Sequence, residues 1–290
     1  MAFFKRCYKL LIEVESAKKV FKEDENTRGL KIEFEVINSC YSKSFCQGNI
    51  TIYNLSDDDM YYLASSAQIL PNKNNPVMKK NAVQLEVGYN NDLGIILAGN
   101  IIAVDSNFNG ADRRVNLKVQ SSVSNNLQNN KIQIAFENNV SNKQIAEQVA
   151  KKNGLTLKWD SKIKELKQSA FSFLGSPLQF LSNFRQMFEN ELNVWIENDG
   201  KTLNVTPIDT PANSIIQIDE DGGMVGIPTL IQSGVKVTTL LNPALRAGGF
   251  VRLKSQKIKQ YNAVYRVIDC KHRGGNQSAE WVTEMNLQKV

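Results

Sequence analysis

The chain of 290 residues is poor in the side chains on which metal sites and nucleophilic enzymes depend. It has one histidine, His272, and its four cysteines form no C-x-x-C pair. Zinc sites need several closely spaced ligands, and Ser-His-Asp or Cys-His catalysis would have to use this one histidine. Because Arg273 and the pair Gly274–Gly275 follow it, we interpret His272 as part of an exposed turn rather than as a catalytic residue.

Other motifs that would indicate chemistry are also missing. There is no G-x-S-x-G nucleophile elbow, and there is no G-x-G-x-x-G or G-x-x-x-x-G-K-[ST] phosphate loop. Asp219–Gly223 starts like a calcium loop, but Leu230 stands where that loop needs a Glu, so we interpret it as a polar turn. Nothing in the sequence singles out a pair of facing carboxylates. We predict that the protein is not an enzyme and has no catalytic, metal-binding or cofactor-binding residues.

Long apolar runs and a secretory signal are absent as well. No run approaches the ~20 apolar residues that cross a bilayer, and the first residues lack an unbroken apolar segment followed by a cleavage site. We expect no membrane span and a protein that is made and folded in a cytoplasm. In that compartment Cys7, Cys40, Cys46 and Cys270 are expected to be buried, reduced thiols.

The net charge of +6 permits an anionic partner. However, the basic residues are dispersed among acidic ones such as Glu23, Asp24 and Glu25. A nucleic-acid-binding protein gathers Lys and Arg on one face, often with aromatic residues among them. We therefore interpret the surface as mildly basic and solvated, and we expect no sequence-specific nucleic acid. A nucleic-acid-binding β-barrel module remains the alternative function.

Residues 1–125 are dominated by alternation of apolar and polar side chains. The segments 32–36, 83–87 and 115–119 are apolar at every second position, which is typical of half-buried antiparallel strands. Between strands, Ser56 is placed to cap a short helix whose first turn holds Asp57–Asp59. A metal site at these three Asp is disfavoured because neighbours on a helix point in different directions. We predict an N-terminal β-barrel domain.

Residues 126–210 combine helices with strands. Ser141 with Gln144, and Ser176 with Gln179, form the pattern of a capping box at two helix starts, and Pro177 suits the first helical position. A strand follows each helix, and the second strand belongs to a hairpin that turns at Asp199–Gly200. We predict a middle α+β domain with two Ser-capped helices. The core-facing stripe of its second helix is expected to comprise Leu178, Leu181, Phe184 and Phe188.

Residues 211–290 return to the alternating pattern in several short segments, which predicts a second small barrel. The expected fold class is therefore mixed β and α+β: two small antiparallel β-barrel domains, 1–125 and 211–290, flank the middle α+β domain 126–210. Ahead of one strand stands "LNPALRAGG". Glycine there suits a tight corner, because it tolerates positive φ and close backbone approach.

The order of these segments resembles that of phage tail baseplate hub proteins of the Mu-like tail protein family. In the C-terminal part the resemblance rests on the V-x-V strand 235–237, Leu241–Pro243, Gly248–Gly249, the strand 265–268, the segment His272–Gly275 and Trp281–Thr283. In the N-terminal part it rests on "NITIYNLSDDDMYYL" and on "VQLEVGYNNDLGIILAGNI". It covers nearly the whole chain and leaves no room for a fused lysozyme or peptidase domain.

The resemblance implies a structural virion protein, the central hub in the baseplate of a phage or phage-like contractile tail. Three copies would form a ring in which barrels alternate, joining the tail tube to the spike. Implied partners are the tail spike, the tube or adaptor proteins, the baseplate wedge proteins and the tape measure protein, with assembly in the host bacterial cytoplasm and a role in host infection. Gly248 and Gly249 could instead form a turn inside one subunit, and this alternative stays open. Candidate subunit-interface residues are Asn54, Leu55, Asn242, Pro243, Gly248 and Gly249.

Overall fold

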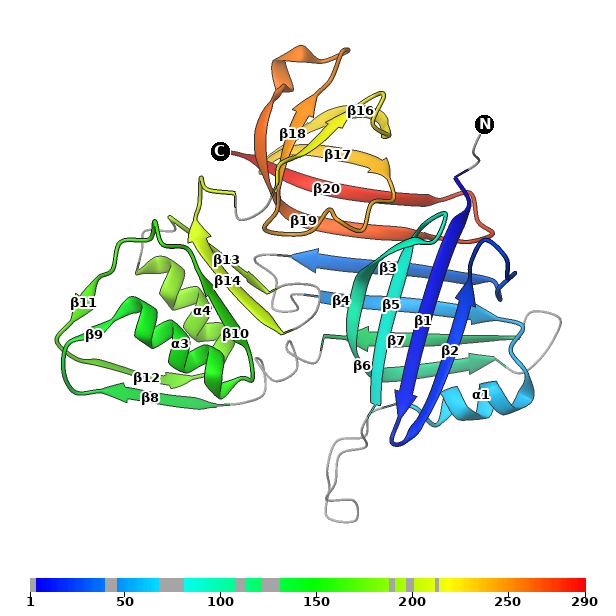
Figure 1. Ribbon diagram of the computed structural model, residues 1–290, viewed down its shortest axis with the longest axis horizontal. Helices are drawn as coiled ribbons and strands as arrows, with labels where there is room; N and C mark the ends of the chain where they lie inside the picture. Colours follow the sequence, from blue (N-terminus) through cyan, green and yellow to red (C-terminus); the bar gives the residue numbers. More distant parts are fainter. Residues whose placement is uncertain are drawn as a thin grey trace.

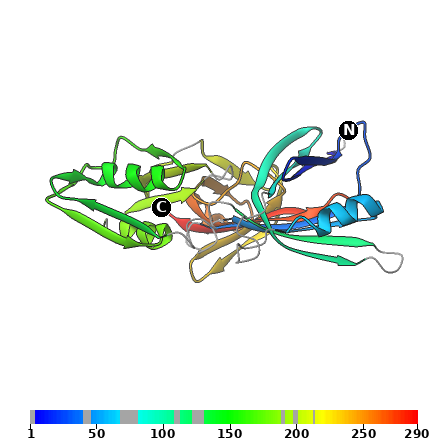
Figure 2. The ribbon, with the colours of Figure 1, turned by 90° about the horizontal axis from the view of Figure 1, so that it is seen from below.

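The chain folds into one large, mostly β body with a smaller α+β segment at one end of its long axis (Figures 1 and 2). This is a computed structural model. It describes residues 4–39, 46–67, 81–107, 113–121, 131–187, 191–196, 201–211 and 214–290.

The described residues of the N-terminal part form seven strands and one helix. The elements are β1 (Arg6–Val14), β2 (Ala17–Glu23), β3 (Ile32–Ser39), β4 (Cys46–Tyr53), α1 (Asp57–Ala64), β5 (Asn81–Tyr89), β6 (Asp92–Asn107) and β7 (Arg114–Gln120). The three strands expected from alternation are confirmed as β3, β5 and β7. Ser56 accepts a hydrogen bond from the Asp59 backbone N–H, which confirms it as the N-cap of α1.

In the middle segment, the residues that the structure describes form two helices and several short strands. Its elements are β8 (Ile132–Phe136), β9 (Val140–Ser141), α3 (Asn142–Lys152), β10 (Thr156–Trp159), β11 (Lys167–Gln168), β12 (Phe171–Gly175), α4 (Pro177–Gln186), β13 (Leu192–Ile196) and β14 (Thr202–Pro207). Both capping boxes are present as predicted. Strand β14 pairs parallel with β10 and antiparallel with β13, while β8 and β12 form a separate ribbon.

Within the middle segment Leu181 and Phe184 are buried, as the stripe of α4 predicts. The Leu178 side chain, Phe188 and the turn at Asp199–Gly200 lie outside the described residues. The strands on both sides of that turn, β13 and β14, pair antiparallel as expected for the hairpin.

Residues 214–290, the described range of the C-terminal part, form six strands. They are β15 (Ile216–Asp219), β16 (Met224–Ile231), β17 (Gly234–Leu240), β18 (Phe250–Lys254), β19 (Ala263–Gly275) and β20 (Trp281–Lys289), with a short 3-10 helix at Lys259–Tyr261. The polar turn predicted at Asp219–Gly223 is confirmed, since the Asp219 carboxylate accepts a hydrogen bond from the Gly222 N–H.

The two terminal parts share one 13-stranded sheet, and this corrects the expectation of two separate barrels. Its main path runs β16-β17-β20-β19-β3-β4-β7-β6-β5-β1-β2. Strand β19 is long enough to pair with β18 through its first half and with β3 through its second half. No closed barrel is found among the residues that the structure describes. Alternation shows which face of a strand is buried but not which strand lies beside it.

The described residues form three main hydrophobic cores, one in each of the three parts of the chain. The N-terminal core also receives Leu241 and Trp281 from the C-terminal part. The proposed boundaries 1–125, 126–210 and 211–290 remain a prediction. No helix of the described residues is long and apolar enough to span a membrane.

Candidate functional site

The segment Leu241–Gly249 links β17 to β18, and we call it the corner. The Leu241 N–H donates to the Trp281 carbonyl at 3.0 Å, and the Asn242 N–H donates to Thr283 Oγ1 at the same distance. The Asn242 carboxamide oxygen then accepts the Ala244 N–H at 2.9 Å. A proline preceded by an asparagine that bonds its own backbone is typical of a tight turn, so this part of the corner is built locally.

Gly248 is the position where the middle segment contacts the corner. Its φ is +84°, and a Cβ atom there would lie 2.5 Å from the Trp195 ring. Asn193 donates from Nδ2 to the Gly248 carbonyl at 3.1 Å. Both the backbone conformation and the indole therefore require glycine. Gly249 has no such φ, and its nearest Cβ contact would be the Arg246 carbonyl at 3.1 Å.

Pro243 brings the corner against the N-terminal part. A Cβ atom at Gly94 of β6 would lie 2.7 Å from the Pro243 Cβ. Leu241, two residues earlier, is buried in the N-terminal core. The corner thus contacts all three parts of the chain, which is the physical reason for its combination of proline and glycine.

A groove of about 1150 Å³ runs beside the corner. The corner forms one wall, the tip of the β5–β6 hairpin forms another, and the middle segment contributes Lys158 and Thr202. Aromatic and apolar side chains of Tyr89, Leu93 and Leu240 line it together with Asp92, Asp221 and Arg246.

The six candidate interface residues do not form one surface patch. Gly248 and Leu55 are buried, Asn242, Pro243 and Gly249 are half-buried, and Asn54 is exposed. Asn54 has a φ of 56°, and its N–H donates to the Arg113 carbonyl at 2.9 Å. Gly248, Pro243 and Leu55 thus have neighbours within their own chain. A role of the six residues between subunits remains a prediction.

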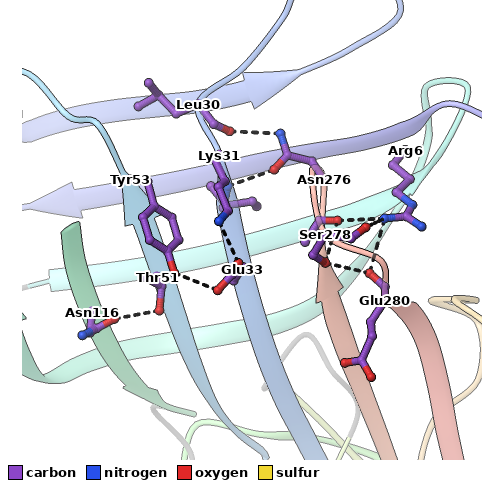
Figure 3. A network of polar contacts seen from close by, with 12 residues as sticks. Arg6, Leu30, Lys31, Glu33, Thr51, Tyr53, Asn116, Asn276, Ser278 and Glu280 are labelled. Carbon is purple, nitrogen blue, oxygen red and sulfur yellow. Dashed lines mark hydrogen bonds and ion pairs between the residues drawn. The ribbon is translucent and has the colours of Figure 1, made fainter. Parts of the chain in front are cut away.

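A second junction fastens the β19–β20 turn to the N-terminal part (Figure 3). The Arg6 guanidinium donates to the carbonyls of Gly275 at 3.0 Å, of Ala279 at 3.2 Å and of Ser278. Asn276 donates to the Leu30 carbonyl at 3.0 Å and accepts the Ile32 N–H at 2.9 Å. The sequence analysis missed this junction. An arginine in an alternating strand and an asparagine in a turn carry no local sign of a distant partner.

His272 is buried in β19, so its placement in an exposed turn was wrong. Its Nδ1 lies 2.9 Å from Thr283 Oγ1, and its Nε2 lies 3.5 Å from the Cys270 Sγ. Burial lowers the pKa of His272 to about 4. The following glycines belong to the same strand. A Cβ at Gly274 or Gly275 would lie 2.7 Å from the carbonyl of Glu280 or Ile32, so they permit close backbone approach instead of a turn.

The described cysteines fit the expectation of buried, reduced thiols. Cys7, Cys46 and Cys270 are buried and free, while Cys40 lies outside the described residues. Burial raises the pKa of the Cys46 thiol to about 12 and also raises that of Cys270. Thiols of this kind are unreactive at neutral pH.

The acidic turn of α1 forms ion pairs with basic residues of neighbouring elements. Asp59 pairs with Lys19 of β2, and Asp57 pairs with Arg113. Among the residues that the structure describes, no three His, Cys, Asp or Glu side chains are grouped so that they could hold a metal ion.

Solved structures with the same fold include tail proteins, one of them from a prophage, and a component of a type VI secretion system. The 43 kDa tail protein of prophage MuSo2 from Shewanella oneidensis matches with a TM-score of 0.65 at 9% identity, covering 97% of this chain and 98% of that one. A tail protein from Neisseria meningitidis gives 0.64 at 10% identity, covering 97% and 96%. An Escherichia coli protein described as a component of the type VI secretion system gives 0.64 at 10% identity, covering 96% and 76%.

The fold is therefore that of phage tail and related proteins, although identities this low show the fold alone. A sequence profile of one family, described as "Baseplate hub gp41", matches residues 10–281. The chain belongs to this baseplate hub family, which confirms the resemblance found in the sequence. A search among curated protein sequences found no significant match.

Proposed function

We propose that the protein is the non-enzymatic central hub of a tail baseplate, in which three copies form a ring that joins the tail tube to the spike. The observation that carries this function is the family match over residues 10–281. The tail-protein fold supports it along the whole chain. The protein then resides in the virion, at the baseplate of the tail.

The internal construction suits a scaffold that passes force between neighbours. One sheet connects the two terminal parts, and Arg6 and Asn276 hold its β19–β20 turn to β1 and β3. Extended backbone hydrogen-bonded across many strands deforms little, because each strand inside the sheet is restrained by two neighbours. The corner adds the middle segment to this body through Trp195 and Gly248.

The expected partners follow from this position in the tail. The spike binds on one side of the ring, and the tube or adaptor proteins bind on the other. Wedge proteins contact its periphery, and the tape measure protein ends at its centre. A chain of a solved PdpA-VgrG complex matches this protein with a TM-score of 0.54 at 10% identity. That structure supports a hub that binds another protein.

The test is native mass spectrometry of the full chain, alone and with its spike partner. We expect trimers, either of the hub alone or stabilised by the spike. A protein that stays monomeric in both conditions would contradict the hub function. Salt-dependent binding of a DNA duplex by the purified protein would favour the alternative, a nucleic-acid-binding module.

A further inference from the structure

The two ends of the 13-stranded sheet differ in chemistry. Strand β16 lies at one end of the main path and β2 lies at the other, and within the described residues each pairs on one side only. In Figure 1 the two strands lie on different sides of the body. A free sheet end either carries features that prevent pairing or receives a partner.

The β16 end is rich in exposed apolar side chains. Three of the twelve large apolar side chains that are exposed in the described residues lie on β16 itself, and one of them, Leu230, is 69% exposed. Scattered apolar residues on a surface need no explanation, but a concentration of this kind marks a contact site. The three are Val225, Ile227 and Leu230.

The backbone of β16 is less suited than that of a regular edge strand to continuous hydrogen bonding with a further strand. Its pairing with β17 shifts between Val225 and Thr229, where Gly226 has a φ of +78°. Pro228, in the same stretch, has no N–H to donate. A partner at this end would therefore be held mainly by apolar side chains, with only short stretches of backbone pairing.

Charge distinguishes the two ends further. Residues 214–233 contain the acids Asp219, Glu220 and Asp221 and no Lys or Arg. On β2, Lys18, Val20 and Lys22 alternate along one face and are exposed. Lys22 forms an exposed ion pair with Asp24, which contributes little. The β2 end thus presents two cations around an apolar side chain, and the β16 end presents apolar side chains beside acids.

We infer that the β16 end of one copy binds the β2 end of the next copy. This inference rests on the ring proposed above and identifies the surfaces that close it. Two β2 ends placed together would oppose lysines, which disfavours a symmetric contact at that end. Contacts between unlike ends are the kind that generate rings when the rotation closes.

The first experiment places a charge in the apolar surface of the full-length chain. Ile227→Asp is expected to raise the dissociation constant of the oligomer by about tenfold or more, because a buried Ile contact is replaced by a desolvated carboxylate. Leu174→Asp is the matched control, since Leu174 is 74% exposed on β12 of the middle segment. The readout is sedimentation velocity over a range of concentrations, with the spike present if wild type needs it.

The second experiment exchanges the charges. Lys18→Glu with Lys22→Glu, and Asp221→Lys alone, should each weaken association. A chain that carries all three changes should recover part of it, because Asp221→Lys places a cation opposite the two introduced carboxylates, while Asp219 and Glu220 stay acidic. Lys162→Glu with Lys164→Glu, at two exposed positions of the middle segment, controls for net charge.

Crosslinking determines which ends meet. A mixture of Val20→Cys and Ile227→Cys chains should give dimers with a short cysteine crosslinker, and neither variant alone should do so beyond wild type. Crosslinking of Ile227→Cys to itself would overturn the inference in favour of a symmetric contact. Wild-type trimers that Ile227→Asp leaves intact would also overturn it but would keep the ring, whereas a monomeric wild type would contradict both.

Discussion

The middle segment and the large sheet are built from interactions of different range along the chain. Helices α3 and α4 begin at serines whose side chains are bonded three residues away. In the sheet, by contrast, Arg6 donates to a carbonyl 269 residues later. The middle segment therefore owes its form to local chemistry, while the sheet depends on contacts that exist only when both ends of the chain are folded.

The corner is where these two kinds of structure meet. Trp195 and Ala247 form a small cluster apart from the three main cores. This cluster and the hydrogen bond from Asn193 to the Gly248 carbonyl connect the middle segment to the corner, and the groove lies beside them. The attachment of the middle segment therefore depends strongly on one glycine, and this gives the comparison its most direct test.

Gly248→Val should have the largest effect. A β-branched residue at a φ of +84°, with its Cβ 2.5 Å from the Trp195 ring, should destabilise the chain by about 3 kcal/mol or more. Urea denaturation measures this. Gly249→Ala is the control and should cost clearly less, because its φ is not positive. Equal losses in both variants would argue against this account of the corner.

The pH dependence of folding stability at His272 tests the burial of β19, the strand that joins the two terminal parts. Its folded-state pKa of about 4 is below the unfolded value of 6.5, so the unfolded chain binds the extra proton first. Stability is therefore complete above pH ~6.5 and falls by about 3 kcal/mol as the pH drops towards 4.

The measurement compares wild type with His272→Gln by urea denaturation between pH 7.5 and 4.5. The variant should lose this part of the pH dependence while assembling normally at neutral pH. A loss of assembly with the fold intact would instead point to a functional role for the imidazole.

Arg6→Ala should loosen the second junction. Four backbone carbonyls of the β19–β20 turn lose a charged donor, and Trp281 loses the guanidinium 5.7 Å from its ring centre. We expect about 2 kcal/mol of destabilisation and faster hydrogen exchange in residues 275–281. Exchange in α3 and α4 should stay unchanged, and a change there would contradict the separation of the two kinds of structure.

Ser141→Ala and Ser176→Ala should have the smallest effects. Each removes one side-chain cap, which typically costs about 1 kcal/mol. Hydrogen exchange should increase at the first turn of the helix concerned and should not change in β3 or β19. Ser→Asp at the same positions retains an N-cap acceptor and should restore most of the loss.

The elements that were predicted from the sequence are those whose determinants are local. Ser56, Ser141 and Ser176 were identified as caps because the bonded partner stands three residues away. The strands were recognised from their alternation, but the pairing of β3 with β19 was not, since no short pattern encodes a neighbour. His272 was misplaced for the same reason: the glycines after it permit close approach of β20 and β3, and neither strand is visible from that stretch.

The split pairing of β19 also has a consequence for the order of folding. During synthesis β3 leaves the ribosome early and keeps an open edge until β19 follows at Ala263–Gly275. The middle segment, with its short-range contacts, is complete before that point. Pairing at such separation is slow and leaves an aggregation-prone edge exposed in the meantime. Nascent chains halted before residue 263 should therefore contain a folded middle segment attached to an incomplete sheet.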